Sequence, residues 1–352
     1  MPQLFSSLQL KNTEIKNRVV MPPMVCFGWA NDDGYTTEQH LQHYEARAKG
    51  GTGLIVLEAH CVAKSGRLAN SQLGIWSDDH IEGLRKLAQV CHHHGAVVIV
   101  QIHHAGLQTA PGIVETAIGP SEKIAVNRKT AAMTLEEIYT LQQAFIDAAI
   151  RAEKAGLDGI ELHGAHGYLI DQFMSPITNQ RTDLYGGELI NRARFAKEII
   201  CGIRKATQDS FILGYRMGGN EPGLEEGIQI ARLLEAAEVD LLHVSAGIGS
   251  NNLPTVPENF PYNWIVYCGT EIKKQVNIPV IVVNDIRTPE RAAYLIEQGL
   301  ADFVAIGRGL LVDPAWAQKA QQREQITSCL NCKKCRWFDD GSKCPQSELD
   351  KK

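Results

Sequence analysis

The segment 158–194 contains residue types whose spacing is suited to chemistry. Its first part, 159–162, is a short apolar run that predicts a buried strand, and His163, His166 and Tyr168 follow at once. Each of these three side chains carries a polar atom that needs a partner if it is buried. Polar side chains at the carboxyl end of a strand are typical of active sites in α/β proteins. Two imidazoles can donate hydrogen bonds to an oxygen that gains charge, and a phenol can act as an acid. The structural alternative is that one histidine caps the segment that follows and the tyrosine packs in the core.

The rest of the chain must supply the elements that position these residues. Eight apolar runs predict buried strands, at 18–21, 53–58, 96–101, 158–162, 211–216, 240–245, 279–283 and 302–306. Amphipathic stretches between and after them predict helices, at 37–49, 79–94, 134–155, 188–206, 225–238, 265–275, 288–298 and 314–325. Strands that alternate with helices indicate a parallel sheet, and eight such units favour a (β/α)₈ TIM barrel over an open sheet.

Two features near the N-terminus support the barrel. Residues 8–20 alternate apolar and polar side chains around Asn12-Thr13, which predicts a hairpin that plugs the bottom of the barrel. An open dinucleotide-binding sheet should carry a G-x-G-x-x-G turn after its first strand, whereas the chain has Met21-Pro22-Pro23-Met24 there. A Rossmann site is therefore disfavoured.

Composition excludes several classes of protein. The 352 residues are 44% hydrophobic and 21% charged, which is ordinary for a globule with a sizeable core. The net charge of −5 and the lack of a basic block argue against a nucleic-acid partner. The N-terminal residues lack a signal-peptide pattern and no apolar run is long enough to span a membrane, so we expect a cytoplasmic protein without a membrane partner.

Four cysteines crowd into a short C-terminal tail. Cys329, Cys332, Cys335 and Cys344 are spaced C-x₂-C-x₂-C-x₈-C, and in a cytosolic chain such thiols indicate a metal site more than disulfides. Both tetrahedral zinc and an iron–sulfur cluster suit four thiolates, and the spacing does not decide between them. The sequence thus predicts a barrel over residues 1–326 and a metal-binding tail over 327–352.

The run HGAHGYLIDQFMSPITNQRTDLYGG at 163–187, followed by NRARF at 191–195, resembles the signature of the old yellow enzyme family of flavoprotein ene-reductases. The resemblance extends over about residues 3–325 and is closest to the bacterial branch that includes the flavin domains of 2,4-dienoyl-CoA reductase and trimethylamine dehydrogenase. It implies a TIM barrel that binds FMN and is recharged by NAD(P)H. Multidomain relatives carry a [4Fe-4S] cluster after the barrel, which favours iron for the tail, although their cysteines are more widely spaced.

The resemblance also implies roles for residues after the first two strands. The flavin edge is lined by Pro22, Pro23, Met24 and Val25. Phe27 borders the substrate and Ala59 packs under the ring. Relatives often have Cys or Thr directly after the Pro-Met pair, but this chain has Val25 there and its thiol at Cys26, so a flavin-tuning thiol is in doubt.

Chemistry suggests how the other strand ends hold a flavin. The carboxamide of Gln101 offers the donors and the acceptor that the pyrimidine edge requires. Arg216 lies in an apolar run, where burying its charge is costly unless an anion is nearby. The reduced flavin is such an anion. The alternative is a structural ion pair with a carboxylate such as Glu58. After the last two strands, a phosphate site is expected at Asn284, Gly307 and Arg308.

Together these residues predict an FMN-dependent ene-reductase. His163 and His166 would polarise the carbonyl of an α,β-unsaturated ketone, aldehyde or thioester, and Tyr168 would protonate Cα after hydride reaches Cβ from flavin N5. Two rivals stay open, an amine dehydrogenase or demethylase that passes electrons to an external carrier and a non-enzymatic flavin redox sensor. We expect a small-molecule substrate and a homo-oligomer, in which Arg336-Trp337 of the tail completes a neighbouring subunit's site as in some relatives. The physiological substrate and the choice between NADH and NADPH are not readable from the sequence.

Overall fold

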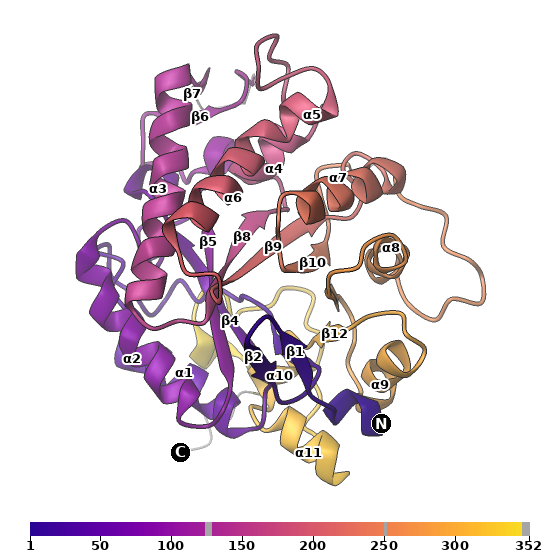
Figure 1. Ribbon diagram of the computed structural model, residues 1–352. Helices are drawn as coiled ribbons and strands as arrows, with labels where there is room; N and C mark the ends of the chain where they lie inside the picture. The colour runs from indigo at the N-terminus through magenta and orange to yellow at the C-terminus, as the bar shows by residue number, and fades with distance from the viewer. Residues whose placement is uncertain (124–128, 250–251, 347–352) are drawn as a thin grey trace.

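The computed structural model describes residues 1–123, 129–249 and 252–346, and its main element is a closed barrel of eight parallel strands (Figure 1). Around the barrel the strands follow one another in chain order, which confirms the TIM barrel that the sequence predicts. The barrel strands are β3 (Val19–Met21), β4 (Leu54–Cys61), β5 (Val97–His103), β8 (Gly159–Gly164), β9 (Ile212–Gly218), β10 (Leu241–Ser245), β11 (Val280–Val283) and β12 (Phe303–Ala305).

Helices surround the barrel and cover its outer face (Figure 1). The larger ones are α1 (Glu38–Lys49), α2 (Ile81–His92), α3 (Leu135–Lys154), α6 (Arg194–Ala206), α7 (Leu224–Ala236), α8 (Trp264–Lys273), α9 (Pro289–Glu297) and α11 (Trp316–Gln322). Local chemistry starts several of them: Thr134 and Glu137 form a capping box on α3, and Thr288 caps α9 directly before Pro289. All eight predicted helices are present, except that the stretch 188–206 is divided into α5 (Leu189–Arg192) and α6.

The bottom of the barrel is closed by the N-terminal hairpin. Strands β1 (Leu8–Leu10) and β2 (Thr13–Ile15) pair in antiparallel fashion, and Leu10 and Ile15 pack against the inward-facing residues of the barrel strands. This arrangement confirms the predicted plug. Three aspartates link neighbouring strands at the same end of the barrel. Asp158, Asp240 and Asp302 each accept a hydrogen bond from the first or second backbone N–H of the preceding barrel strand.

Four short elements lie outside the predicted strand and helix ranges. Strands β6 (Thr116–Gly119) and β7 (Lys129–Ala132) form a two-stranded parallel sheet between β5 and α3. Helix α4 (Leu169–Met174) follows β8, and α10 (Arg308–Val312) follows β12. These elements are too short for a reliable periodic signal, because four to six residues fit both helix and strand patterns. Within the described ranges, no helix is long and apolar enough to cross a membrane.

Candidate active site

The two imidazoles and the phenol meet where β8 ends. His163 is the fifth residue of β8 and lies beside Arg216 of the neighbouring strand β9. Its Nε2 atom is 3.3 Å from Nδ1 of His166, and the Tyr168 ring stands edge-on to His163 with centroids 4.8 Å apart. The Nε2 atom of His166 is 2.7 Å from Oγ of Ser245 at the end of β10. The structure therefore brings together the trio that the sequence singles out.

A left-handed turn gives the trio this geometry. His166 (φ 61°) and Gly167 (φ 75°) both have left-handed backbone conformations, which are unfavourable for the non-glycine residue. A residue of the loop after β5 stabilises this turn, because the side-chain amide of Gln108 donates to the carbonyls of His166 and Gly167. Tyr168 then starts α4 as its N-cap residue.

Burial controls the charge of these groups. It lowers the pKa of His163 and of His166 well below the ordinary value, and for both the Arg216 guanidinium acts in the same direction. Both imidazoles are therefore neutral at physiological pH and can donate one hydrogen bond each. Burial also raises the pKa of Tyr168, with Arg216 opposing the shift, so the phenol carries its proton.

Arg216 and Gln101 are two further polar residues of this site, and we refer to them as the cavity floor. Arg216 is 8% exposed, and its Nε atom has no hydrogen-bond partner among the described residues. The alternative pairing with Glu58 is absent from the described contacts, since that carboxyl contacts Cys26 N and Tyr44 on the other side of β4. Gln101 donates from Nε2 to Glu161 (2.7 Å), a buried carboxylate that also contacts His243.

One cavity of about 1080 Å³ collects every residue predicted to bind cofactor or substrate. Its lining includes Pro22, Pro23, Met24, Val25, Phe27, Ala59, Gln101, His163, His166, Tyr168, Arg216, Asn284, Gly307 and Arg308. The volume exceeds the roughly 300–1,000 Å³ of most small-molecule pockets, so there is room for a cofactor and a second ligand. Sequence reasoning missed further lining residues, which include Leu68, Ser245, four residues after β11 (285–288) and part of the C-terminal tail.

The tail forms one wall of this cavity. Residues 326–329, together with Asn331, Lys333 and Phe338, line it beside the predicted phosphate residues, and Arg308 donates to the Asn331 side chain. Trp337 is fully buried within its own chain, between Trp29 and His43. Its indole is therefore not available to a neighbouring subunit, whereas a role for the exposed Arg336 in a neighbour's site stays a prediction.

The predicted metal site is not assembled in the structure. Among the described residues, no group of three or more Cys, His, Asp or Glu side chains is arranged to hold a metal, and residues 347–352 of the predicted tail lie outside the described ranges. Cys329, Cys332, Cys335 and Cys344 line a second cavity of about 350 Å³, and the first three of them also line the large cavity. They are free thiols, with Cys332 exposed and the other three half-buried. In this arrangement the thiols lie around a cavity wall and do not form a closed tetrahedral set, so metal binding by the tail stays a prediction.

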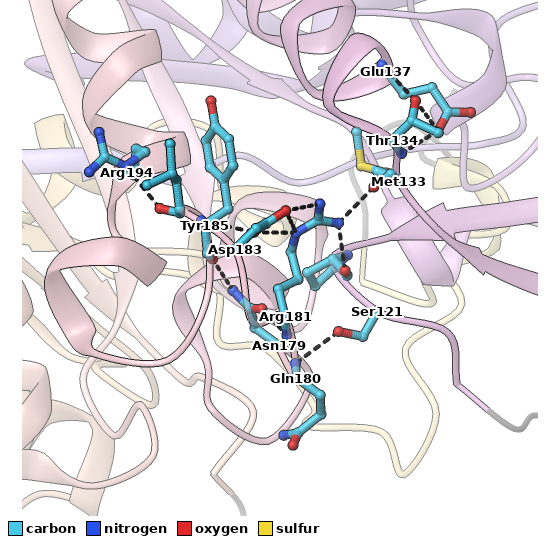
Figure 2. Close-up of polar contacts among 12 residues, drawn as sticks. Ser121, Met133, Thr134, Glu137, Asn179, Gln180, Arg181, Asp183, Tyr185 and Arg194 are labelled. Atoms are coloured by element: carbon cyan, nitrogen blue, oxygen red, sulfur yellow. Dashed lines mark hydrogen bonds and ion pairs between the residues drawn. The ribbon is translucent and has the colours of Figure 1, made fainter.

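The remainder of the signature loop is structural, as expected from its polar density (Figure 2). The Arg181 guanidinium donates to the carbonyls of Pro120 and Met133 and contacts Asp183. Asn179 donates to two carbonyls of its own loop, those of Phe173 and Tyr185. These contacts tie the loop after α4 to the segment that precedes α3.

Comparison with known proteins places the molecule among flavoprotein oxidoreductases. The chain belongs to the NADH:flavin oxidoreductase / NADH oxidase family, whose model matches residues 3–326. It is 39% identical over 326 residues to an NADPH dehydrogenase of Halalkalibacterium halodurans, which covers 90% of this chain and 94% of that protein. The old yellow enzyme homologue of Zymomonas mobilis superposes with a TM-score of 0.81 at 25% identity, covering 96% of this chain and 99% of the other. The chain is thus an NAD(P)H-dependent flavin oxidoreductase.

A longer relative shows the same core. The chain is 47% identical over 347 residues to an NADH oxidase of Thermoanaerobacter brockii. That match covers 94% of this chain but 53% of the relative, so the chain spans about half the length of that protein. The resemblance therefore concerns only about half of that relative.

Proposed function

We propose that the chain is an FMN-dependent ene-reductase, which uses NAD(P)H to reduce the C=C bond of α,β-unsaturated carbonyl compounds. The observation that carries the proposal is the approach of two neutral imidazole nitrogens, His163 Nε2 and His166 Nδ1, to 3.3 Å beside the phenol of Tyr168 on the wall of the large cavity. A carbonyl oxygen that takes the place of their mutual contact receives a hydrogen bond from each ring.

Ser245 selects the tautomer that this binding requires. Its hydroxyl can donate to His166 Nε2, which leaves the single proton of the neutral ring on Nδ1, facing His163. Because neither ring is charged, the two donors bind the carbonyl moderately in the ground state and more strongly once the oxygen gains enolate charge. Donors aimed at developing charge contribute selectively to the transition state.

Tyr168 is the proton donor in the proposal. Its phenol remains protonated because burial raises its pKa, and its ring lies against the His163 ring that holds the carbonyl. An acid with a high pKa is matched to a basic enolate carbon. Proton transfer of this kind contributes roughly 10²- to 10⁴-fold to rate.

The residues of the cavity floor fit a flavin mononucleotide. The unpartnered Nε of Arg216 is a buried donor that an anionic ring can satisfy. Gln101 is oriented by Glu161, so its amide oxygen can accept from the N–H of a pyrimidine edge. Arg308 and the turn at Asn284, which has a left-handed φ of 103°, lie at the end of the cavity where a phosphate would bind. When bound, the flavin supplies hydride transfer from NAD(P)H to the β carbon.

A half-reaction comparison tests the proposal. NAD(P)H oxidation measured without oxygen should depend on added 2-cyclohexenone, and Tyr168→Phe should slow enone reduction by about 10²-fold or more while flavin reduction by NAD(P)H stays near the wild-type rate. Only the second half-reaction needs a proton on carbon. Absence of an enone-dependent rate in the wild type would sink the ene-reductase assignment, and equal slowing of both half-reactions would remove Tyr168 from the acid role.

For the tail, we propose that the four thiols bind a metal when one is supplied. The support is chemical: all four cysteines line one cavity together with the cations Arg308, Lys334, Arg336 and Lys343, which stabilise thiolates. Protein purified without oxygen should contain about one zinc ion or one iron–sulfur cluster per chain, and the double variant Cys329→Ser/Cys332→Ser should contain neither. Metal analysis and the visible spectrum distinguish the two metals, and a wild-type chain free of both refutes the proposal.

A further inference from the structure

Two buried carboxyl groups lie behind the turn that carries His166 and Tyr168. Asp171 and Glu221 are each 1% exposed and do not line the large cavity. One oxygen of each is bound to backbone: Asp171 Oδ2 accepts from Gly167 N at 2.7 Å, and Glu221 Oε2 accepts from Ile248 N. The other two oxygens, Asp171 Oδ1 and Glu221 Oε1, have no hydrogen-bond partner among the described residues, and each carboxyl group shifts the pKa of the other.

These two oxygens can share a proton. No described N–H or hydroxyl group donates to Asp171 Oδ1 or to Glu221 Oε1, so both are buried acceptors without a donor. Two ionised carboxylates both accept and cannot bond to each other, whereas one proton between them makes one group a donor. The geometry therefore calls for a singly protonated pair.

The pair joins the two segments that hold His166. On one side, the Asp171 bond to Gly167 N closes the left-handed turn formed by His166 and Gly167. On the other, the Glu221 bond fixes the loop after β10, where His166 N donates to the Ala246 carbonyl at 3.1 Å. A left-handed conformation at a non-glycine residue persists only where its surroundings impose it.

The charges around the pair do not favour a second ionisation. Burial is the largest cause that raises the pKa of Asp171 well above its ordinary value and also raises that of Glu221. The other groups that face the pair are the Tyr215 and Ser175 hydroxyls and the Glu226 carboxylate, which itself is bound by Arg192. None of these supplies a positive charge directly to the pair, so losing the shared proton leaves two unscreened anions.

We propose that Asp171 and Glu221 are positioning residues that share one proton, and that this proton keeps the turn bearing His166 and Tyr168 in its reactive conformation. The kinetic part of this inference rests on the proposed ene-reductase activity, whereas the shared proton itself does not. Because folding raises the pKa values, the stabilisation by the pair is fully present below the ordinary carboxyl range and is lost as the pH rises through the folded values.

Glu221→Gln provides a direct test, because an amide donates the same hydrogen bond to Asp171 at every pH. The midpoint of thermal unfolding would be measured for the FMN-loaded wild type and Glu221→Gln from pH 6 to pH 10. We expect the wild type to lose stability relative to the variant as the pH rises, since ionisations common to both proteins cancel in the difference. Parallel curves would overturn the shared proton.

A kinetic comparison tests the positioning role. Asp171→Ala should lower the rate of enone reduction by about 10- to 100-fold with FMN still bound, and Asp171→Asn, which keeps the bond to Gly167 N and can donate to Glu221, should restore most of it. An Asn variant as slow as the Ala variant would overturn the role. If the wild type has no enone-dependent rate, the proposed function fails, and the unfolding comparison still decides whether the proton is shared.

Discussion

At the scale of single residues, Ser245 is the contact that sequence reasoning missed. Ser245 is one serine at the end of an apolar strand, and its partner His166 is 79 positions away in the chain. Its hydroxyl is also 3.5 Å from Arg216, so it connects the imidazole pair with the cation of the cavity floor. The only available signal was its position at the end of the sixth barrel strand, where every strand end faces the same mouth.

Removing this hydroxyl should affect one half-reaction. Ser245→Ala leaves the proton of His166 free to occupy either nitrogen, so we expect enone reduction to fall by about tenfold while flavin reduction by NAD(P)H changes little. Ser245→Thr keeps a hydroxyl and serves as the matched control. Rapid-mixing measurements of the two half-reactions check the expectation, which is wrong if both variants behave alike.

The imidazoles can also be tested without turnover. Phenols bound as anions over an oxidised flavin give a long-wavelength charge-transfer band, and the double variant His163→Ala/His166→Ala should abolish that band while keeping FMN. The reason is that both neutral rings donate to the bound oxygen. A titration with a substituted phenol reports the band directly, and an undiminished band would move the anion site elsewhere in the cavity.

At the scale of elements, the tail and the loop after β3 interlock. The Phe27 backbone N–H donates to the Phe338 carbonyl at 3.1 Å, and the Cys26 thiol donates to the Trp337 carbonyl at 3.5 Å. Burial raises the pKa of Cys26 to about 12, so this thiol is an inert packing group. The two segments approach each other closely at Gly28, where an added Cβ atom would lie 2.6 Å from the Asp339 carbonyl oxygen.

Trp337 should carry most of this docking. Trp337→Ala empties a fully buried indole site, so we expect a loss of about 3–5 kcal/mol of folding free energy and weaker substrate binding, since Phe27 and Phe338 line the cavity. Phe338→Ala is the control for the folding free energy, because that ring is 40% exposed. Chemical denaturation and the KM for enone measure the two effects. Equal losses in both variants would show that the indole is not the anchor.

At the scale of the whole molecule, a buried carboxyl on β4 makes stability depend on pH. Glu58 is fully buried, bound by Tyr44 and Cys26 N and 3.7 Å from the neutral His40. Burial raises its pKa from 4.5 to about 8. The folded-state value is the higher one, so its contribution is fully present below about pH 4.5 and is lost as the pH rises through 8.

Glu58→Gln should remove that dependence. The amide cannot ionise, so the unfolding midpoint of the variant should fall less steeply than that of the wild type between pH 5 and pH 8. Thermal unfolding in matched buffers measures the slopes, with Glu45→Gln on the exposed face of α1 as a control for the general effect of removing a carboxylate. Equal slopes for Glu58→Gln and the wild type would show that Glu58 is already ionised in the fold.

The sequence by itself determined the barrel and the side chains at its mouth. Each of the eight strands is a local apolar run, and a barrel that closes them in chain order brings their carboxyl ends to one rim. For this reason the sequence could assign distant strand-end residues to one cavity, among them Pro22, Gln101, Arg216 and Arg308. Their roles could be predicted because burying a charge or an amide in an apolar run costs free energy unless a ligand or partner binds it.

Only the tertiary structure decided which polar groups meet across the chain. The Asp171–Glu221 pair, the contact of Ser245 with His166 and the docking of Trp337 beside Cys26 join segments that no local pattern links; the last spans 311 positions. It likewise showed four cysteines around a cavity wall where their spacing had predicted a metal site. The physical reason is that periodicity reports which face of an element is buried, whereas hydrogen bonds and ligand sets depend on distances that only packing establishes.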